Sequence, residues 1–174
     1  MKTNLKTKIF LLVLLSVLIL IAIGFSTAFI VNSKVIGTAH EKLVGDLAMG
    51  RALLNEKQPG AWSIRDGKLF KGDAQMDGNF TISDTIGELT GDTVTLFLGD
   101  TRVSTNVKMP KGERAVGTKA ARNVVDATLT GGKVYIGKAN VAGIWNQTAY
   151  EPIKTADGRI IGMFYVGVTQ HPLR

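Results

Sequence analysis

The chain has 174 residues, enough for one domain of about 100–150 residues with an appended segment. It contains no cysteine, which excludes disulfides, thiolate metal sites and thiol nucleophiles. The formal net charge is +7, but Lys2, Lys6 and Lys8 precede the first apolar run and the other positive charges are dispersed. Dispersed charge gives little support to nucleic-acid binding, and we expect no nucleic-acid partner.

Residues 9–31 form an apolar run without a charged side chain. At about 1.5 Å per residue, a helix of this length reaches about 34 Å, enough to cross a hydrocarbon core of about 30 Å. The lysines on its N-terminal side predict a cytoplasmic N-terminus and an extracytoplasmic remainder, held at the cell membrane by a single pass. A cleaved signal peptide is the alternative, but the run exceeds a usual h-region and large apolar residues follow Ser26–Ala28 directly.

Helical periodicity continues beyond this run. Apolar side chains recur every four residues, at Val35, Ala39, Leu43 and Leu47, with polar residues between them. The pattern predicts an amphipathic helix over residues 32–57, which Gln58-Pro59-Gly60 ends. Its apolar stripe can cover the following sheet or pair with the same helix of a second subunit, and we expect a homodimer through it.

The rest of the chain reads as short strands joined by tight turns, with few segments long enough for crossover helices. We expect a hairpin at 61–70, a loop at 71–79, a short helix at 83–89, strands at 93–98 and 101–107, a basic loop at 109–117, a helix at 118–130 and three strands within 132–168. Strand runs of this kind favour an antiparallel α+β sheet over a doubly wound fold.

The last expected strand, residues 158–168, is apolar on both faces, which predicts a central position in the sheet. The Asp157-Gly158 pair before it is typical of a tight hairpin turn. The expected organisation is a basic cytoplasmic tail at 1–8, a transmembrane helix at 9–31, a long amphipathic helix at 32–57, a globular domain at 58–168 and a C-terminal tail at 169–174.

Five stretches, taken in order, carry a family resemblance: residues 102–107, 112–118, 132–139, 150–153 and 157–168. Over about residues 35–168 the chain resembles the single Cache domain found outside the membrane in bacterial methyl-accepting chemotaxis proteins and related receptors. The resemblance implies a PAS-like, five-stranded antiparallel sheet with a long N-terminal helix continuous with the membrane helix. It also implies a small-molecule pocket on the sheet face away from that helix, and a dimeric receptor.

In such receptors the final strand leads into a second membrane helix and a cytoplasmic signalling module, whereas this sequence ends at Arg174. We therefore expect either a receptor fragment, truncated before the second transmembrane helix and output domain, or an anchored sensor that signals through a partner.

Candidate ligand-binding residues follow from strand alternation and residue type. On a regular strand Arg102, Ser104 and Asn106 share a face, where a guanidinium would suit a carboxylate. The alternative is that Arg102 leaves a hairpin edge for water, and that the aromatic candidates fill the core. The full set of candidates is Arg102, Ser104, Asn106, Arg114, Lys119, Tyr135, Trp145 and Tyr150.

The sequence lacks the motifs of common catalytic sites, including His-Glu-x-x-His, the phosphate-binding loop and Gly-x-Ser-x-Gly. Its two histidines leave most nucleophile–base pairs unavailable. We expect no enzyme, no cofactor and no metal site. The expected function is binding of an organic acid or amino acid for transmembrane signalling or chemotaxis. The alternative is a ligand-free structural or dimerisation module anchored in the membrane.

Overall fold

A computed structural model describes the backbone of residues 4–169, with all side chains except those of residues 32–36 and 169. The chain divides into two compact units, residues 1–38 and 39–174. One helix, α1 (Leu5–Lys57), contributes to both units, so the two helices expected at 9–31 and 32–57 are continuous. The expected domain boundaries stay predictions.

The first unit consists of the N-terminal part of α1. Among the described residues, one helical stretch, Leu5–Val31, is long and apolar enough to cross a membrane, with a mean hydropathy of 3.0. Its side chains are exposed, as an anchor's are in the absence of lipid. A signal sequence would share this length and composition.

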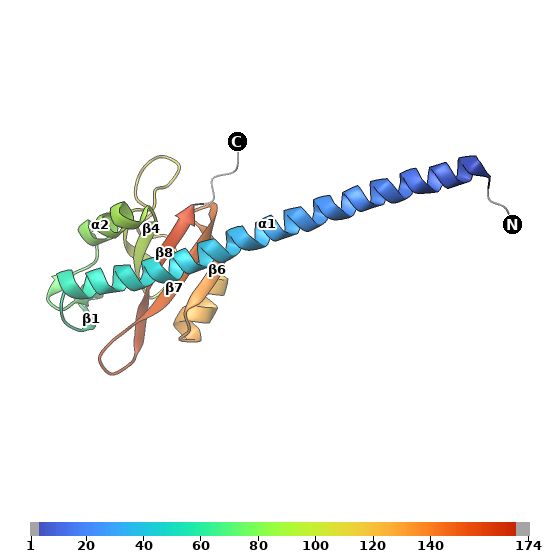
Figure 1. Ribbon diagram of the computed structural model, residues 1–174. Coiled ribbons are helices and arrows are strands. Elements are labelled where there is room, and N and C mark those ends of the chain that lie inside the picture. Colours follow the sequence, from blue (N-terminus) through green and yellow to red (C-terminus); the bar gives the residue numbers. More distant parts are fainter. Residues whose placement is uncertain (1–3, 170–174) are drawn as a thin grey trace. The chain divides into compact units, whose positions relative to one another are not determined.

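The second unit is built on a five-stranded antiparallel sheet in the order β5-β4-β8-β7-β6 (Figure 1). The central strand is β8, as its two apolar faces predict. The fold is the expected PAS-like α+β arrangement. The strands are β4 (Thr93–Leu98), β5 (Thr101–Thr105), β6 (Tyr135–Val141), β7 (Ile144–Lys154) and β8 (Ile160–Thr169).

Smaller elements flank this sheet. Two of them differ from expectation, because residues 71–79 contain a short strand and the helix expected at 118–130 begins only at Arg122 and continues as a π-helical segment. The smaller strands are β1 (Trp62–Arg65), β2 (Lys68–Lys71) and β3 (Ala74–Gln75), which form a second sheet. The smaller helices are α2 (Thr81–Thr90), α3 (Arg122–Val124) and η1 (Val125–Thr130).

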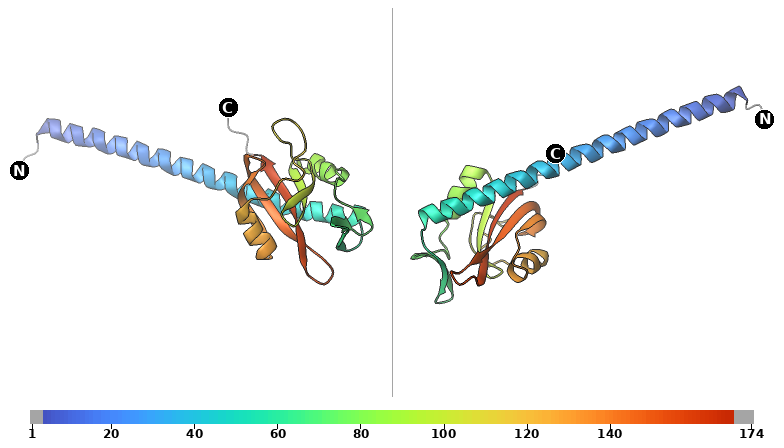
Figure 2. Two further views of the ribbon diagram at one scale, coloured as in Figure 1. Left: turned by 180° about the vertical axis from the view of Figure 1, so that it is seen from behind. Right: turned by 60° about the horizontal axis from the view of Figure 1, so that its bottom comes forward.

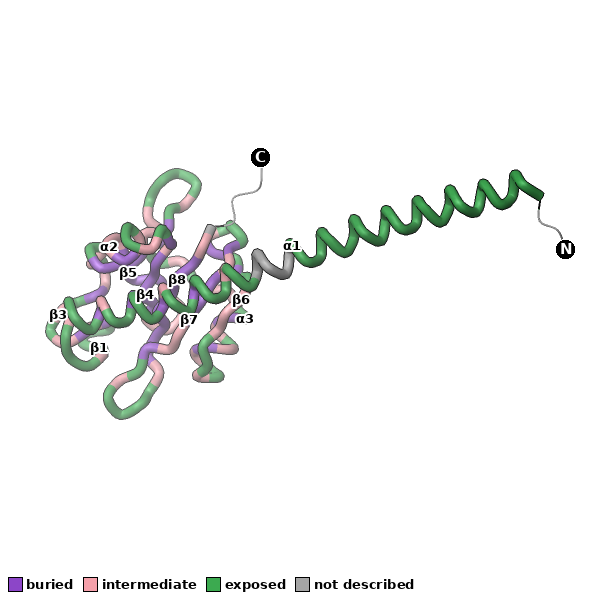
Figure 3. The backbone as a smooth tube through the Cα atoms, viewed as in Figure 1, coloured by how far each residue is buried: buried purple, intermediate pink, exposed green. Residues whose placement is uncertain are grey.

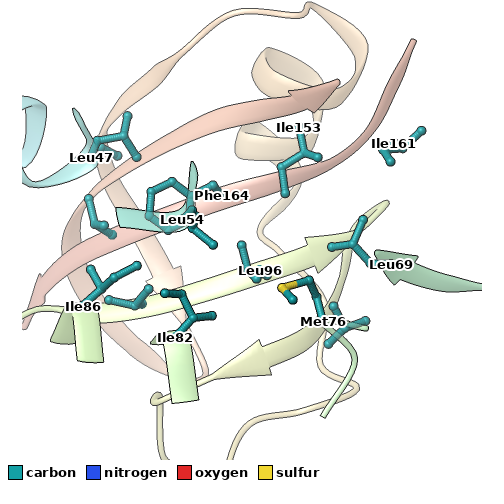
Figure 4. Close-up of a cluster of buried hydrophobic side chains, with 14 of the residues drawn as sticks. Leu47, Leu54, Leu69, Met76, Ile82, Ile86, Leu96, Ile153, Ile161 and Phe164 are labelled. Atoms are coloured by element: carbon teal, nitrogen blue, oxygen red, sulfur yellow. The ribbon is translucent and has the colours of Figure 1, made fainter. Parts of the chain in front are cut away.

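One face of the main sheet is covered by residues 39–57 of α1 and by α2 (Figures 2 and 3). Leu43, Leu47 and Leu54 of α1 are buried against the sheet, where Phe164 is central (Figure 4). Each such burial stabilises the domain by about 1.5–3 kcal/mol. The apolar stripe of α1 therefore covers the sheet, which is one of its two expected uses.

α1 is also tied to the domain by an ion pair. Lys42 Nζ donates to Asp92 Oδ1 at 2.6 Å and to the Thr90 carbonyl at 3.1 Å, and it pairs with Asp46 one helical turn away. Asp92 is buried, and its Oδ2 has no hydrogen-bond partner. Burial raises the pKa of Asp92 to about 6. The folded domain therefore binds this proton more tightly than the unfolded chain, in which an aspartate has a pKa of about 4.

The raised pKa of Asp92 predicts a pH-dependent stability. The contribution of the protonated carboxyl is complete below about pH 4 and is lost as the pH rises through about 6, so the free energy of unfolding should fall by about 1–3 kcal/mol over this window. Asp92→Asn should lack this part of the pH dependence. Burial also raises the pKa of Glu151. The quantity to measure at each pH is therefore the difference in the free energy of unfolding between the parent protein and Asp92→Asn. Equal slopes from pH 4 to pH 7 would contradict the assignment.

Candidate functional site

The other face of the main sheet carries a buried polar site whose central residue is Arg102 on β5. Leu96 of β4 pairs with Ser104 and Phe97 pairs with Arg102, so Val103 is an extra, bulged residue. A bulge reverses the alternation of the strand beyond it. Arg102 therefore lies with Phe97 on the face away from α1, whereas Ser104 lies toward α2. The expectation that Arg102, Ser104 and Asn106 share a face is wrong for this reason.

Arg102 is almost completely enclosed, with 1% of its surface exposed. Its Nη1 donates to Thr118 Oγ1 at 2.7 Å, and its guanidinium lies 5.0 Å from the centre of the Phe97 ring. Its Nε and Nη2 are buried, and neither has a hydrogen-bond partner among the described residues. Burial lowers the pKa of Arg102, and the phenols of Tyr150 and Tyr165 partly oppose this shift. A buried guanidinium with two free donor atoms and no carboxylate carries a large desolvation cost.

A row of hydroxyl-bearing side chains crosses the sheet beside Arg102. Strand register pairs Tyr135 with Tyr150, Tyr150 with Tyr165, and Tyr165 with Thr95. The Tyr150 and Tyr165 rings are 4.7 Å apart between centres, and those of Tyr135 and Tyr150 are 6.2 Å apart and edge-on. Because the register aligns them on one face, three residues distant in sequence form one aromatic wall.

Tyr165 has a complete hydrogen-bond arrangement. Thr93 Oγ1 donates to the Gly167 carbonyl at 2.9 Å, so Tyr165 Oη must be the donor in its 2.8 Å contact with Thr93 Oγ1. Gly167 makes room for this phenol, since a Cβ there would lie 2.1 Å from Tyr165 Oη. Burial raises the pKa of Tyr165, which keeps the phenol neutral and able to donate.

Tyr150 differs because its hydroxyl is buried without a partner. Burial strongly raises the pKa of Tyr150. A neutral phenol with a free O–H and the free nitrogens of Arg102 are the donors that a carboxylate would accept from. Arg102 and Tyr150 are thus two of the predicted residues that the fold brings together.

The cover over this face consists of α3, η1 and the segment 107–121, with Val107, Ala115 and Val124 buried against the sheet (Figure 2). η1 packs over β7 and β8, and its Thr128 hydroxyl is also buried without a partner. π-Helical turns are uncommon and often occur at functional sites. This enclosure means that a ligand can reach Arg102 only when part of the cover moves.

The other predicted residues have structural partners or face elsewhere. Ser104 Oγ donates to the Asn79 carbonyl at 2.6 Å and contacts Ser83 of α2. Asn106 accepts a hydrogen bond from the Val94 amide at 2.6 Å and donates to the Asp92 carbonyl, which fixes the start of β4.

Arg114 of the basic loop and Lys119, just after it, are both paired. Arg114 donates to both carboxylate oxygens of Asp84 at 2.7 and 2.8 Å and to the Thr105 carbonyl at 2.7 Å. The hydrogen bonds to Asp84 raise the pKa of Arg114 and tie the loop to α2. Lys119 lies on the surface and pairs with both carboxylate oxygens of Asp100 at 2.8 Å. Neither cation faces the Tyr150 hydroxyl.

The two remaining aromatic candidates separate. Tyr135 lies at the edge of the tyrosine row, where its hydroxyl donates to the Lys138 carbonyl at 2.6 Å and accepts from Asn123. Trp145 pairs with Asn140 across the β6–β7 hairpin, is 60% exposed and belongs to the opposite face from Tyr150. Tyr135 therefore borders the site, and Trp145 lies outside it.

Three further residues of the site were missed from sequence. In the described part of the chain, Phe97 and Thr118 contact Arg102, and the Tyr165 ring lies beside that of Tyr150. Tyr165 could have been placed opposite Tyr150 by assuming a regular hairpin through Asp157-Gly158. No sequence pattern indicates that Thr118 contacts Arg102, because this contact depends on where the segment after the basic loop crosses the edge of β5.

A curved antiparallel sheet, with a long N-terminal helix on one face and a covered polar site on the other, defines the PAS-like class of sensor domains. Residues 74–174 match the family model of single cache domain 3, which is more than half of the chain, and the chain belongs to this family. A comparison with curated proteins finds no match.

Proposed function

We propose that this chain is a membrane-anchored, extracytoplasmic sensor that binds a small organic anion at Arg102, with a role in transmembrane signalling such as chemotaxis. The observation that carries the proposal is the buried Arg102 guanidinium, whose Nε and Nη2 have no hydrogen-bond partner. The Tyr150 hydroxyl, on the same face of the sheet, also has none. A carboxylate placed there would satisfy these donors and neutralise the buried charge. The ligand class is an organic acid, or an amino acid held by its carboxylate. The proposed action is binding and not catalysis.

Transmission to α1 is supported by a chain of contacts. Tyr165 of the aromatic wall donates to Thr93, and the neighbouring residue, Asp92, holds Lys42 of α1. A ligand shifts an equilibrium only when it binds two states unequally. In the proposed mechanism the covering segment 107–121 closes over the anion, and the altered aromatic wall changes how β4 holds α1.

Anchoring by residues 9–31, with a cytoplasmic N-terminus, is part of the same proposal and rests on the apolar stretch Leu5–Val31 and the lysines before it. A homodimer through α1 is supported by Val44 and Met49, whose side chains remain 46% and 41% exposed on this helix. Apolar side chains left exposed on a helix are suited to a helix–helix contact.

The test is calorimetric titration of the full chain in lipid nanodiscs with a panel of small mono- and dicarboxylates. We expect at least one acid to bind saturably, and Arg102→Ala to weaken it by about 100-fold, because a buried charge-assisted contact is worth about 2–5 kcal/mol. Lys68→Ala, which removes an exposed cation from β2, should change the affinity less than about threefold. Binding that survives Arg102→Ala would remove the assigned role. A panel without any ligand would favour the structural module.

A further inference from the structure

A cavity of about 250 Å³ lies between α1 and the sheet, on the face opposite the Arg102 site. Its apolar lining comes from α1, β1, β7 and β8, through Leu54, Trp62, Ile153 and Phe164. Leu54, Ile153 and Phe164 are buried, and Trp62 is half-buried. A small apolar group entering this cavity would meet a ready-made hydrophobic surface with an aromatic wall.

Two opposite charges border the same cavity. Arg51 of α1 donates through Nη1 to Glu151 Oε2 of β7 at 2.8 Å. The Arg51 side chain is 57% exposed, so most of its guanidinium donors face solvent, whereas the Glu151 side chain is 12% exposed. Burial raises the pKa of Glu151, and Arg51 opposes this shift. A partly desolvated carboxylate and an accessible guanidinium thus lie side by side next to an apolar cavity.

We propose that this cavity binds a free α-amino acid with an apolar side chain. The ammonium group would donate to Glu151, the carboxylate would accept from the solvent-facing nitrogens of Arg51, and the side chain would enter the apolar cavity. The charge pattern selects this class, because a simple carboxylic acid would be repelled by Glu151 and a simple amine by Arg51. Only a zwitterion matches both charges at once.

The position of the cavity gives such a ligand direct contact with α1. Tyr150 and Glu151 are neighbours on β7 and point to opposite faces, so the two sites lie back to back across one strand. An amino acid held by Arg51 and Leu54 on one side and by β7 on the other would fasten α1 to the sheet. This second site is independent of any anion bound at Arg102.

The two tryptophans of the chain provide a local probe. In a Trp145→Phe background, Trp62 is the remaining tryptophan and lines the cavity. Titration of this full-length variant in nanodiscs with L-leucine or L-phenylalanine, excited at wavelengths that phenylalanine does not absorb, should change the Trp62 emission saturably, with matching heats by calorimetry. 3-Phenylpropionate and phenethylamine, which each lack one charge, should bind at least about tenfold more weakly than phenylalanine.

Two variants test the charge assignment, and two others serve as controls. Glu151→Gln should weaken phenylalanine binding at least about tenfold but leave the affinity for 3-phenylpropionate, which has no ammonium group, undiminished. Arg51→Gln should also weaken phenylalanine binding at least about tenfold but leave the affinity for phenethylamine, which has no carboxylate, undiminished. Glu88→Gln, the same change on the exposed face of α2, should leave the affinity unchanged. Arg102→Met should keep the Trp62 response even if the Arg102 site binds nothing.

Three results would overturn this second site. They are no saturable binding of either amino acid, a phenylalanine affinity that neither Glu151→Gln nor Arg51→Gln reduces, and a Trp62 response that Arg102→Met removes. The last result would place the amino acid at the Arg102 site instead. Circular dichroism of each variant identifies one that fails to fold, in which case the other charge variant decides.

Discussion

Arg102→Met is expected to stabilise the ligand-free protein while it removes anion binding. The guanidinium is buried with two unpartnered nitrogens, and methionine fills a similar volume without a charge to desolvate. The substitution loses the hydrogen bond to Thr118 and the contact with Phe97, which together offset part of the gain. We expect a net increase of about 1–2 kcal/mol in the free energy of unfolding. Chemical unfolding without ligand, paired with the titration above, measures both effects.

A matched control for Arg102 is Arg114→Met. Arg114 lies in the covering segment 107–121, and it donates to the two carboxylate oxygens of Asp84 and to the Thr105 carbonyl. Its removal leaves these acceptors unpaired and should lower the free energy of unfolding by about 1–3 kcal/mol. If Arg102→Met raises the free energy of unfolding and Arg114→Met lowers it, the Arg102 charge is retained for binding and not for stability. If Arg102→Met destabilises the protein as Arg114→Met does, Arg102 is a structural residue.

Gly162→Ala is expected to have the largest effect on stability of the substitutions considered. Gly162 lies on the central strand β8, and a Cβ at this position would be 1.9 Å from the Phe97 carbonyl oxygen and 3.0 Å from its carbon. The obstacle is backbone of the neighbouring strand β4, which cannot move away without breaking the ladder between β4 and β8. We expect a loss of about 3 kcal/mol or more in the free energy of unfolding, measured by chemical denaturation.

Gly45→Ala is the matched control for the glycine change. Gly45 lies on the exposed side of α1, and a Cβ there would meet nothing within 4 Å. Alanine favours the helix over glycine, so this variant should be up to about 1 kcal/mol more stable than the parent. Gly162→Ala within about 1 kcal/mol of the parent protein would show that β4 and β8 can separate locally at little cost.

The buried Arg102 guanidinium, which has two unpartnered nitrogens, makes the two faces of the main sheet chemically different. The α1 face is an apolar core around Leu96 and Phe164, whereas the opposite face holds the unpaired donors of Arg102 and Tyr150. Natural domains retain such groups where a ligand or a second state compensates for them. Trp145 and Lys119 are exposed to water, so neither needs a ligand to compensate for burial.

The Arg102 region also indicates how far the sequence-based site prediction could reach. Arg102 and Tyr150 were identified by residue type and by their place on expected strands, and both lie in the buried site. Ser104 and Asn106 were assigned by assuming regular alternation, which the bulge at Val103 breaks. Arg114 was judged by its basic loop, but its partner Asp84 lies 30 positions away in the sequence. A pattern within a short stretch of sequence cannot predict a contact between residues so far apart in the chain.

By itself, the sequence determined the apolar stretch of α1, the strands of the main sheet and the central place of β8, because these depend on periodicity and composition within short windows. The family resemblance rests on the order of five separate stretches. The tertiary structure alone decided which face each β5 side chain occupies, and that Arg102 is enclosed without a counter-ion among the described residues. These features depend on strand register and on one inserted residue. A shift of one position moves every following side chain to the other face of the sheet.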